Sequence, residues 1–218
     1  MFKFDVNYLD NLLKTSQNIE DPLKEISQLG LQSSCTIFVS SNKSNWSGSG
    51  FYIGNKMIVT AGHVVSDPAV SEINITFDNK NFYKANIFKI EENYDAAILV
   101  CDFIDKLIPS LKLGNSDSLE IGDPVIVVSA PEGFHDTATF GRVSNIHQSV
   151  KNVQSPAWND IIFIDADILE GSSGGMVLGS DGLVYGIVIG VTGSHADIGI
   201  GENSVCPSNK IKTLISNI

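Results

Sequence analysis

The chain has 218 residues, of which 43% are hydrophobic and 18% charged, a composition that is typical of globular proteins and excludes intrinsic disorder. Lys and Arg number 14 and Asp and Glu number 25, so the net charge is −11, spread along the sequence. Because an acidic surface repels phosphate groups, we expect no binding to nucleic acid and none to an anionic membrane surface.

The cysteines and the apolar segments bear on the cellular compartment. Cys35, Cys101 and Cys206 are odd in number and make no disulfide framework, and no spacing of Cys and His is typical of a zinc site. The first residues lack the apolar run of a signal peptide, and no run of about 18 apolar residues could span a membrane. We therefore predict a cytoplasmic protein that holds no metal and no cofactor.

Residues 5–30 differ from the rest of the chain in the spacing of their apolar residues. Those that recur at helical intervals are Val6, Leu9, Leu12, Leu13, Leu23, Ile26 and Leu29. This pattern predicts two short helices, the second ending at Gly30, within a helical N-terminal extension of residues 1–32. We expect the extension to pack on the rest of the domain. Residues 5–30 are also the predicted contact for a homo-oligomer or a regulatory partner.

From residue 33 onward, short runs of β-branched and aromatic residues alternate with turn residues. Examples are CTIFVS (35–40), KMIVTA (56–61), DAAILVC (95–101), PVIVVSA (124–130) and GLVYGIVIGV (182–191). Their number and spacing predict an all-β fold, either a sandwich or a barrel. Residues 208–218 predict a closing helix with Ser208 or Asn209 as its N-cap.

The loop Gly171-Ser172-Ser173-Gly174-Gly175 joins two of these predicted strands. A serine hydroxyl is a weak nucleophile unless a base removes its proton and hydrogen-bond donors stabilise the oxyanion that forms. Glycines on both sides let the backbone turn tightly and aim its N–H groups at one point. Taken alone, such a loop is more often an ordinary turn.

Two further segments supply the partners that a reactive serine needs. His63 follows the predicted strand KMIVTA, and Asp95 directly precedes the apolar run AAILV. Taken singly, each residue would be read as structural. Their order along the chain, His then Asp then Ser, is the order of the catalytic triad in enzymes of the chymotrypsin fold.

These segments together resemble the trypsin-like peptidases, and in particular the HtrA/Deg protease domain. Gly48-Ser49-Gly50-Phe51 is similar to the strand that precedes the family's histidine. Further similar segments are Leu113–Asp117, Ile121–Asp123, Asp165–Ile168 and Val205–Ser208. The resemblance covers roughly residues 34–211. It implies a chymotrypsin-like double β-barrel, with barrel 1 over about 33–110, barrel 2 over about 111–207 and a C-terminal helix over 208–218. Relatives often carry a PDZ domain, but only 45 residues follow Ser173, so we expect none in this chain.

The resemblance also implies a role for each residue of the site. Ser173 would attack the scissile carbonyl of a protein or peptide substrate, His63 would carry the proton, and Asp95 would orient the histidine. The backbone N–H groups of Gly171 and Ser173 would form the oxyanion hole. Ser172 departs from the family, which carries Asn or Asp there, and its neutral side chain argues against activation by a newly released N-terminus.

The predicted substrate pocket contains Asp167, Gly190 and Val191, and its cues conflict. Asp167 lies six residues before Ser173, where an acidic residue would select Lys or Arg, although it is read equally well as a solvent-facing turn residue. Val191 would narrow the entrance and favour small or medium apolar side chains. Trp46 and Trp158 are read as packing or loop aromatics.

The sequence therefore predicts a serine endopeptidase that works through an acyl-enzyme. Two alternatives stay open. The first is a catalytically silent binding module on the same fold, since a fold does not guarantee activity. The second is an esterase or other acyl-transfer enzyme using the same site, although no G-x-S-x-G elbow is present.

Overall fold

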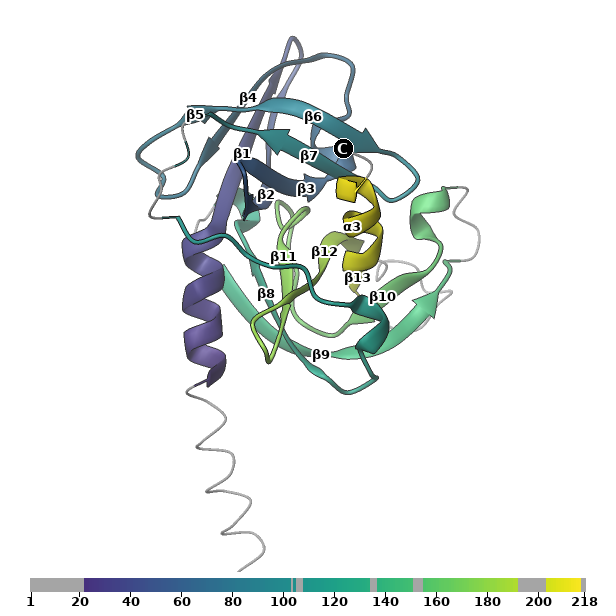
Figure 1. The fold of residues 1–218 in the computed structure, drawn as a ribbon. Coiled ribbons are helices and arrows are strands. Elements are labelled where there is room, and N and C mark those ends of the chain that lie inside the picture. Colours follow the sequence, from purple (N-terminus) through teal and green to yellow (C-terminus); the bar gives the residue numbers. More distant parts are fainter. Residues whose placement is uncertain are drawn as a thin grey trace, which may run out of the picture.

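The computed structural model describes residues 22–102, 104, 108–133, 137–150, 155–191 and 203–216. Residues 22–33 form a helix that runs directly into the first strand and lies along one side of the molecule (Figure 1). The first of the two helices predicted in the N-terminal extension lies outside the described residues, as does the greater part of the segment 5–30.

The predicted helix end at Gly30 is wrong, because the helix continues to residue 33. Glycine at this position gives the helix space. A β-carbon on Gly30 would lie 2.7 Å from Leu178 Cδ1 and 2.9 Å from Val128 Cγ2, so a larger residue would have to displace these side chains. The helix stops at Ser33, whose Oγ lies 2.8 Å from the Pro109 carbonyl oxygen and 3.1 Å from that of Leu29, so its single proton bonds to one of them.

Seven strands form the first sheet, in the spatial order β5-β4-β1-β2-β3-β7-β6. Their bounds are β1 (Ser34–Ser41), β2 (Asn45–Gly54), β3 (Met57–Ala61), β4 (Val70–Thr76), β5 (Tyr83–Lys84), β6 (Asn86–Glu91) and β7 (Ala96–Val100). All neighbouring strands are antiparallel. A single helical turn, α2 (Gly62–Val65), follows β3. Hydrogen bonding leaves this sheet open between β5 and β6.

Six strands form the second sheet, which closes into a barrel in the order β10-β13-β12-β11-β8-β9. Their bounds are β8 (Pro124–Ser129), β9 (Thr137–Gln148), β10 (Ile161–Ile164), β11 (Met176–Gly179), β12 (Val184–Val191) and β13 (Asn203–Pro207). Three 3-10 turns, η1 (Ser116–Ser118), η2 (Pro131–Gly133) and η3 (Pro156–Trp158), lie in the connections. The closing helix α3 (Ser208–Ser216) packs between the two sheets in Figure 1.

The alternation of side chains along β8 divides the core in two. Val125 and Val127 point into the closed barrel, where they pack with residues such as Val188 and Val205. Ile126 and Val128 point the other way and join a larger cluster that also holds buried residues of the first sheet and of α3. Because this second cluster crosses the boundary between the sheets, the two halves bury one common core.

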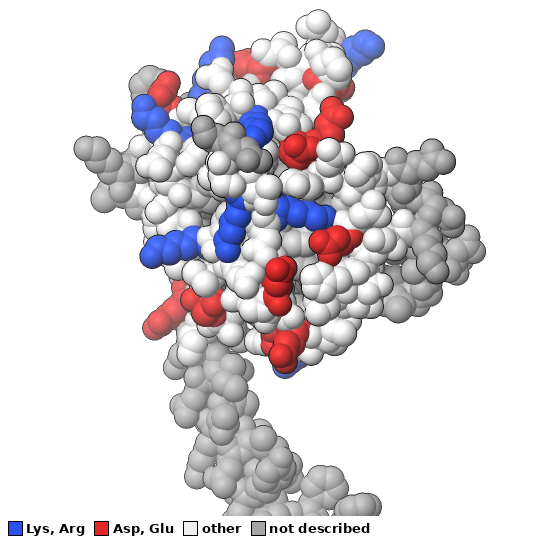
Figure 2. Space-filling model, turned by 45° about the vertical axis from the view of Figure 1, so that its right-hand side comes forward, with Lys and Arg blue, Asp and Glu red and all other residues white. Residues whose placement is uncertain are grey.

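The all-β class, the helical N-terminal extension and the closing helix are confirmed by this architecture. Acidic and basic residues are interspersed on the face drawn in Figure 2. Within the described ranges, no group of three or more His, Cys, Asp or Glu side chains is placed to hold a metal ion. No helix in those ranges is long and apolar enough to cross a membrane.

Candidate active site

His63 and Asp95 are held together by two hydrogen bonds. The Asp95 carboxylate accepts one from His63 Nδ1, at 2.7 Å to Oδ2, and one from the His63 backbone N–H, at 2.7 Å to Oδ1. The aspartate side chain is 15% exposed and the histidine 47%. An ionised carboxylate only accepts hydrogen bonds, so the Nδ1 proton faces Asp95 and Nε2 is left as the basic nitrogen.

The backbone around this pair is fixed by the first sheet. His63 lies in α2, directly after β3, and Asp95 directly precedes β7, the strand that pairs with β3. The Gly62 N–H donates to the Asp95 carbonyl at 2.9 Å, and the Asp95 N–H donates to the Glu92 carbonyl at 3.3 Å. Asp95 has a φ of +50°, a conformation that Asp tolerates better than bulkier residues. The turn between β6 and β7 thus sets the direction of the carboxylate.

Ser173 lies in the loop between β10 and β11, and this loop is tied to its own barrel. The Gly174 N–H donates to the Val188 carbonyl at 2.8 Å, and the Val188 N–H donates to the Gly175 carbonyl at 2.9 Å. Within the loop, the Ser172 N–H donates to the Leu169 carbonyl at 3.1 Å. These bonds extend the edge of β12 into the loop and hold the half-buried Ser173 at the end of that edge.

The same loop packs against the strands that lead to His63. The Ser49 N–H in β2 donates to the Ser173 carbonyl at 2.8 Å. A β-carbon on Gly174 would lie 2.2 Å from the Ser49 carbonyl oxygen and 2.8 Å from the Ala61 nitrogen, and the φ of Gly174 is +85°. Only glycine satisfies both constraints. The Ser173 loop therefore packs against Ala61, the last residue of β3, which lies two residues before His63 in the sequence.

The Ser49 side chain is a second link between the halves, and it is fully buried. Its Oγ donates to the Gly171 carbonyl at 2.8 Å and accepts from the Ala130 N–H at 2.8 Å. A further bond joins the Glu132 N–H to the Glu170 carbonyl at 2.8 Å. In a trans peptide the carbonyl and the N–H point in opposite directions, so the Gly171 N–H faces away from Glu132.

Two N–H groups of the loop stand out for lacking an acceptor. Among the hydrogen bonds of the described residues, none is donated by the N–H of Gly171 or of Ser173, whereas those of Ser172, Gly174 and Gly175 are all used. Backbone N–H groups inside proteins are rarely left unpaired. Two unpaired N–H groups, one on the nucleophile residue Ser173 and one two residues before it, form an arrangement that can bind a developing negative charge.

Ser172, where the sequence departs from the family, is buried and satisfied by neutral partners. Its Oγ accepts from the Leu169 N–H at 3.3 Å and from Ser129 Oγ at 3.2 Å. The side chain is 2% exposed, so a charged residue here would need a buried counter-ion. The hydroxyl pair of Ser172 and Ser129 holds the loop without any charge.

The three residues predicted for the substrate pocket lie in different settings. The side chain of Asp167 is exposed, and its carbonyl accepts from Thr139 Oγ1 at 2.8 Å. Gly190 in β12 pairs with Ser204 in β13, while the pairing of β12 with β11 ends at Ile187, so the other edge of β12 at Gly190 pairs with no strand of the described chain. The backbone of Val191 pairs with Asn203, and its side chain lies outside the described residues.

A pocket of about 290 Å³ opens beside the His63–Asp95 pair. Its walls come from β6, which contributes Ile90, from the β6–β7 turn, which contributes Glu92, and from η3, which contributes Trp158. The Trp158 ring packs on Gly190, where an added β-carbon would lie 3.1 Å from ring atom Cη2. Trp158 is thus both a packing aromatic, as predicted, and a wall of the pocket, which the sequence did not indicate.

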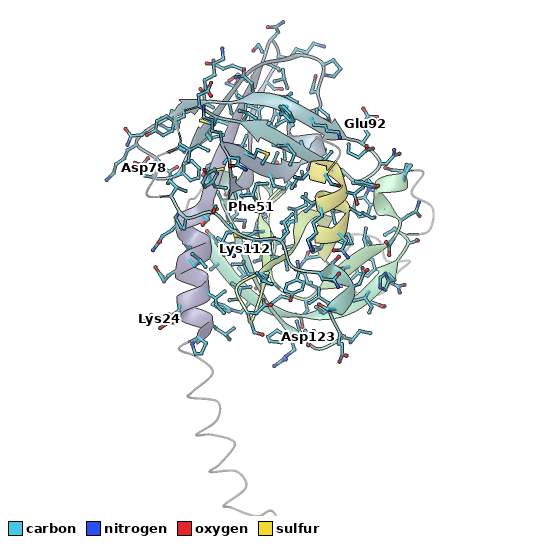
Figure 3. The ribbon with its side chains drawn as sticks, viewed as in Figure 1. Lys24, Phe51, Asp78, Glu92, Lys112 and Asp123 are labelled. Atoms are coloured by element: carbon cyan, nitrogen blue, oxygen red, sulfur yellow. The ribbon has the colours of Figure 1, made fainter. Side chains whose placement is uncertain are left out.

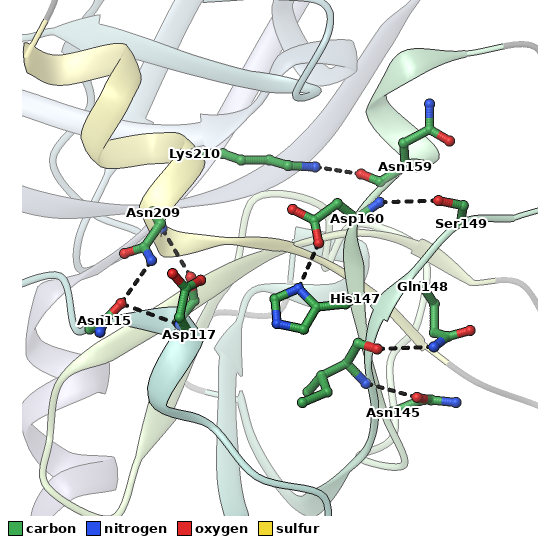
Figure 4. Close-up of polar contacts among 12 residues, drawn as sticks. Asn115, Asp117, Asn145, His147, Gln148, Ser149, Asn159, Asp160, Asn209 and Lys210 are labelled. Atoms are coloured by element: carbon green, nitrogen blue, oxygen red, sulfur yellow. Dashed lines mark hydrogen bonds and ion pairs between the residues drawn. The ribbon is translucent and has the colours of Figure 1, made fainter.

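A second histidine–aspartate pair, drawn in Figure 4, is not part of the lining of this pocket. His147 Nδ1 is 2.7 Å from Asp160 Oδ1, and both side chains are more than half exposed. This pair joins the end of β9 to the residue before β10. Ser149 Oγ accepts from the Asp160 backbone N–H at 3.4 Å, but no hydrogen bond of the described residues joins a serine or cysteine to the His147 ring, and we assign the pair no catalytic role.

The family model described as "Trypsin-like peptidase domain" matches residues 48–187, a range that contains His63, Asp95 and Ser173. This chain belongs to the trypsin-like peptidase family.

Relatives of the family refine this assignment. The chain is 32% identical over 174 residues to a "Probable periplasmic serine endoprotease DegP-like" of Chlamydia muridarum, covering 78% of the chain and 34% of the relative. It is 32% identical to "Serine protease HTRA1A" of Danio rerio, with 78% and 34% covered. It is 30% identical to "Periplasmic serine endoprotease DegP" of Salmonella typhimurium, with 74% and 33% covered. The chain thus spans about a third of the length of these relatives. Their names confirm the predicted HtrA/Deg resemblance and the serine-protease class.

Solved structures confirm the chymotrypsin-like fold. The Rv3671c protease from M. tuberculosis in its active form superposes with a TM-score of 0.76 at 22% identity, covering 88% of this chain and 82% of that one. An HtrA-type protease, AlgW with a tripeptide, superposes with a TM-score of 0.72 at 21% identity, covering 85% and 60%. At these identities the likeness concerns the fold alone.

The predicted cytoplasmic location is wrong. Relatives from Chlamydia and Salmonella are named periplasmic endoproteases, which points to a periplasmic or extracellular location. Cysteine content misled the prediction because this core is complete without a disulfide. All three thiols are fully buried, and burial raises the pKa of the Cys206 thiol to about 12, so the reactive thiolate is suppressed whatever the compartment.

Proposed function

We propose that this domain is a serine endopeptidase in which Ser173, His63 and Asp95 act as the catalytic triad. The observation that carries the proposal is the His63–Asp95 hydrogen bond at 2.7 Å, beside a serine loop in which the N–H groups of Gly171 and Ser173 are unpaired. A lone dyad would serve many purposes. A dyad beside a glycine-flanked serine with free amide donors suits acyl transfer.

The first half-reaction forms an acyl-enzyme. Ser173 Oγ attacks the carbonyl carbon of the scissile bond while His63 Nε2 takes the hydroxyl proton. Asp95 stabilises the imidazolium through Nδ1, and the carbonyl oxygen becomes an oxyanion that accepts from the N–H groups of Gly171 and Ser173. The intermediate then collapses: the C–N bond breaks, and His63 gives its proton to the leaving amine.

The second half-reaction returns the enzyme to its starting state. Water attacks the ester carbon, and His63 Nε2 takes one of its protons. The same N–H pair stabilises the second oxyanion. The bond to Ser173 Oγ breaks, His63 gives the proton back to the serine oxygen, and the acid product leaves.

The free edge of β12 at Gly190 offers the substrate a place to bind. An extended peptide can add to such an edge by main-chain hydrogen bonds. Val188 already bonds to Gly174 and Gly175, so a peptide paired at Gly190 would continue from the serine loop. In this arrangement the scissile carbonyl lies at Ser173, and the residues on its amino side run along β12.

The test is covalent labelling with a fluorophosphonate, followed by the intact mass. We expect one adduct on the wild-type chain and none on Ser173→Ala. The matched control is Ser180→Ala, which removes an exposed hydroxyl outside this loop and leaves Ser173 in place. Labelling of Ser173→Ala would overturn the assignment of the nucleophile.

A second measurement separates the peptidase from the alternative functions. Peptide and ester substrates are compared on wild type and Ser173→Ala. Turnover of peptides that is lost in Ser173→Ala supports the endopeptidase. Turnover of esters alone favours an esterase. Peptide binding that survives in Ser173→Ala, together with no labelling and no turnover by the wild type, favours a silent binding module.

A further inference from the structure

We propose that the pocket beside His63 binds a Lys or Arg side chain of the substrate, with Glu92 as the acid that selects it. This inference rests on the proposed function and adds a substrate class to it. The side chain concerned belongs to P2, the second residue on the amino side of the scissile bond, with P1 directly before that bond.

The position of the pocket relates it to P2. His63 is part of its lining, so the pocket adjoins the reacting bond. Its far wall, Trp158, packs on Gly190, the strand edge along which the amino side of the substrate would run. Neighbouring side chains of an extended peptide point to opposite faces. If P1 turns toward the side of Asp167 and Val191, P2 turns toward His63 and this pocket.

The charge of the pocket determines what it accepts. The described residues that line it contain no Lys or Arg; they are Gly62, His63, Ser66, Ile90, Glu92, Asp95, Ser155, Ala157 and Trp158. The Asp95 carboxylate already accepts two hydrogen bonds from His63. The Glu92 carboxylate is exposed, and no hydrogen bond or ion pair among the described residues reaches it. Glu92 is therefore the acid that is free to pair with a ligand.

Among the described residues, no cation from the surroundings of Glu92 takes the place of the substrate. In Figure 3 Glu92 lies at the outer end of the β6–β7 turn, on the side of the short turn η3. Lys210 of α3 comes from the neighbouring helix, but its Nζ donates to the Asn159 carbonyl at 2.5 Å (Figure 4), and it lies 5.8 Å from the centre of the Tyr94 ring. Lys210 is thus engaged elsewhere and does not line the pocket.

The remaining walls suit the stem of a long basic side chain. Lys and Arg bury their methylene stem along apolar surface and keep the charged end in water. Ile90 and Trp158 provide such a surface, and an indole ring also attracts a cation placed over its face. An acidic side chain would meet Glu92 and Asp95 and be repelled. The pocket thus combines an apolar wall, an aromatic ring and one unpaired acid.

The experiment compares two quenched-fluorescence peptides that differ only at P2, one with Lys and one with norleucine, which has the same stem without the charge. We expect wild type to cleave the Lys peptide about 10-fold faster in kcat/KM, a ratio expected for an exposed ion pair with a cation–π contact. Glu92→Gln should reduce this ratio to about 2, and Glu92→Lys should favour P2 Glu. Raising the salt concentration should lower the wild-type ratio by screening.

The matched control is Glu91→Gln, which makes the same charge change one residue away. Glu91 accepts from the N–H and the side-chain amide of Asn93 and does not line the pocket, so the ratio should stay at its wild-type value. Equal ratios for the two peptides on wild type, or equal losses in Glu92→Gln and Glu91→Gln, would overturn the proposal.

Fluorophosphonate labelling of each variant keeps the two proposals apart. Labelled wild type without a Lys preference means that the pocket assignment is wrong and the peptidase assignment holds. If wild type is not labelled, the pocket is tested by fluorescence anisotropy of the same two peptides on Ser173→Ala. If Ser173→Ala binds the Lys peptide more tightly, and the double variant with both Glu92→Gln and Ser173→Ala does not, the pocket proposal is supported without the peptidase proposal. Equal binding of the two peptides to Ser173→Ala refutes the pocket proposal.

Discussion

The two halves of the site are supported in different ways. On the side of the first sheet, Asp95 is held by Gly62, His63 and Glu92, which all belong to that sheet and its turns. On the side of the closed barrel, the Ser173 loop is held both by its own barrel and by Ser49 of the first sheet. The acid–base pair is therefore a local structure, whereas the nucleophile loop takes its shape only when the two halves are packed together.

The largest expected effect comes from Asp95→Asn, which tests whether the local pair sets the histidine tautomer. Both groups that face Asp95 Oδ1 and Oδ2 are donors, and an amide offers only one acceptor. Its oxygen would keep the His63 backbone N–H and its NH₂ would donate to Nδ1, which moves the ring proton to Nε2. We expect kcat to fall by about 10⁴-fold at neutral pH.

The tautomer itself can be read from the ¹⁵N chemical shifts of the His63 ring, so the cause is checked apart from the rate. Asp102→Asn is the matched control, because Asp102 is an exposed acid whose ion pair is with Lys56, away from His63. A rate close to that of wild type in Asp95→Asn would show that Asp95 does not orient the base.

A smaller effect is expected from Ser49→Ala, which removes the link across the halves. The change leaves the Gly171 carbonyl and the buried Ala130 N–H without their partner, so the loop should lose its alignment. We expect kcat and the rate of fluorophosphonate labelling to fall about 100-fold, the loss typical of one oxyanion donor, with KM nearly unchanged.

Ser47→Ala is the control for this variant, since Ser47 lies on the same strand and its side chain has no hydrogen bond in the described structure. The His63 ring signals should be the same in Ser49→Ala and in wild type, because the acid–base pair is local. A parallel change in the His63 signals would contradict the contrast between the halves.

The smallest expected effect is a loss of folding stability at alkaline pH, caused by one buried thiol in each half. Burial raises the pKa of the Cys206 thiol to about 12, and burial together with the nearby Cys101 raises the pKa of Cys35 further. Below about pH 8.5 the thiols are protonated in both the folded and the unfolded state, so they do not lower the free energy of unfolding. As the pH rises further, the thiols ionise first in the unfolded state, and each then lowers the free energy of unfolding by up to about 1.4 kcal/mol per pH unit.

Urea unfolding between pH 7 and 10 measures this loss. Cys35→Val and Cys206→Val should each flatten the pH dependence by a similar amount, because the common core makes the halves unfold as one unit. Two separate unfolding transitions, with each substitution affecting only one of them, would show that the halves are independent.

Much of the site could be predicted from the sequence because its residues carry local signals. The glycines around Ser173, the strand before His63 and the apolar run after Asp95 each mark a position in the chain. Gly174 shows why the pattern is so strict, since both its φ and the closeness of Ser49 require glycine.

The remaining features depend on contacts between distant residues. Because glycine often ends a helix, Gly30 predicts a helix end. In the structure it lies inside the helix, where the side chains of Leu178 and Val128 leave little space for a β-carbon. Ser129 and Ser172 are 43 residues apart, and Glu92 and Trp158 meet only in the folded chain. Ser49 belongs to a segment that resembles the family, yet nothing in the sequence indicates that its hydroxyl joins the two halves.

The open edge of the first sheet has a consequence for solubility. A free strand edge invites pairing with another molecule and so promotes aggregation. Here one edge strand, β5, has only two residues, and the other, β6, is interrupted by a bulge between Ile87 and Lys89. Lys89 reaches from that edge to the Leu214 carbonyl near the end of α3. These features oppose edge-to-edge growth in a sheet that, unlike the closed barrel, still has edges to protect.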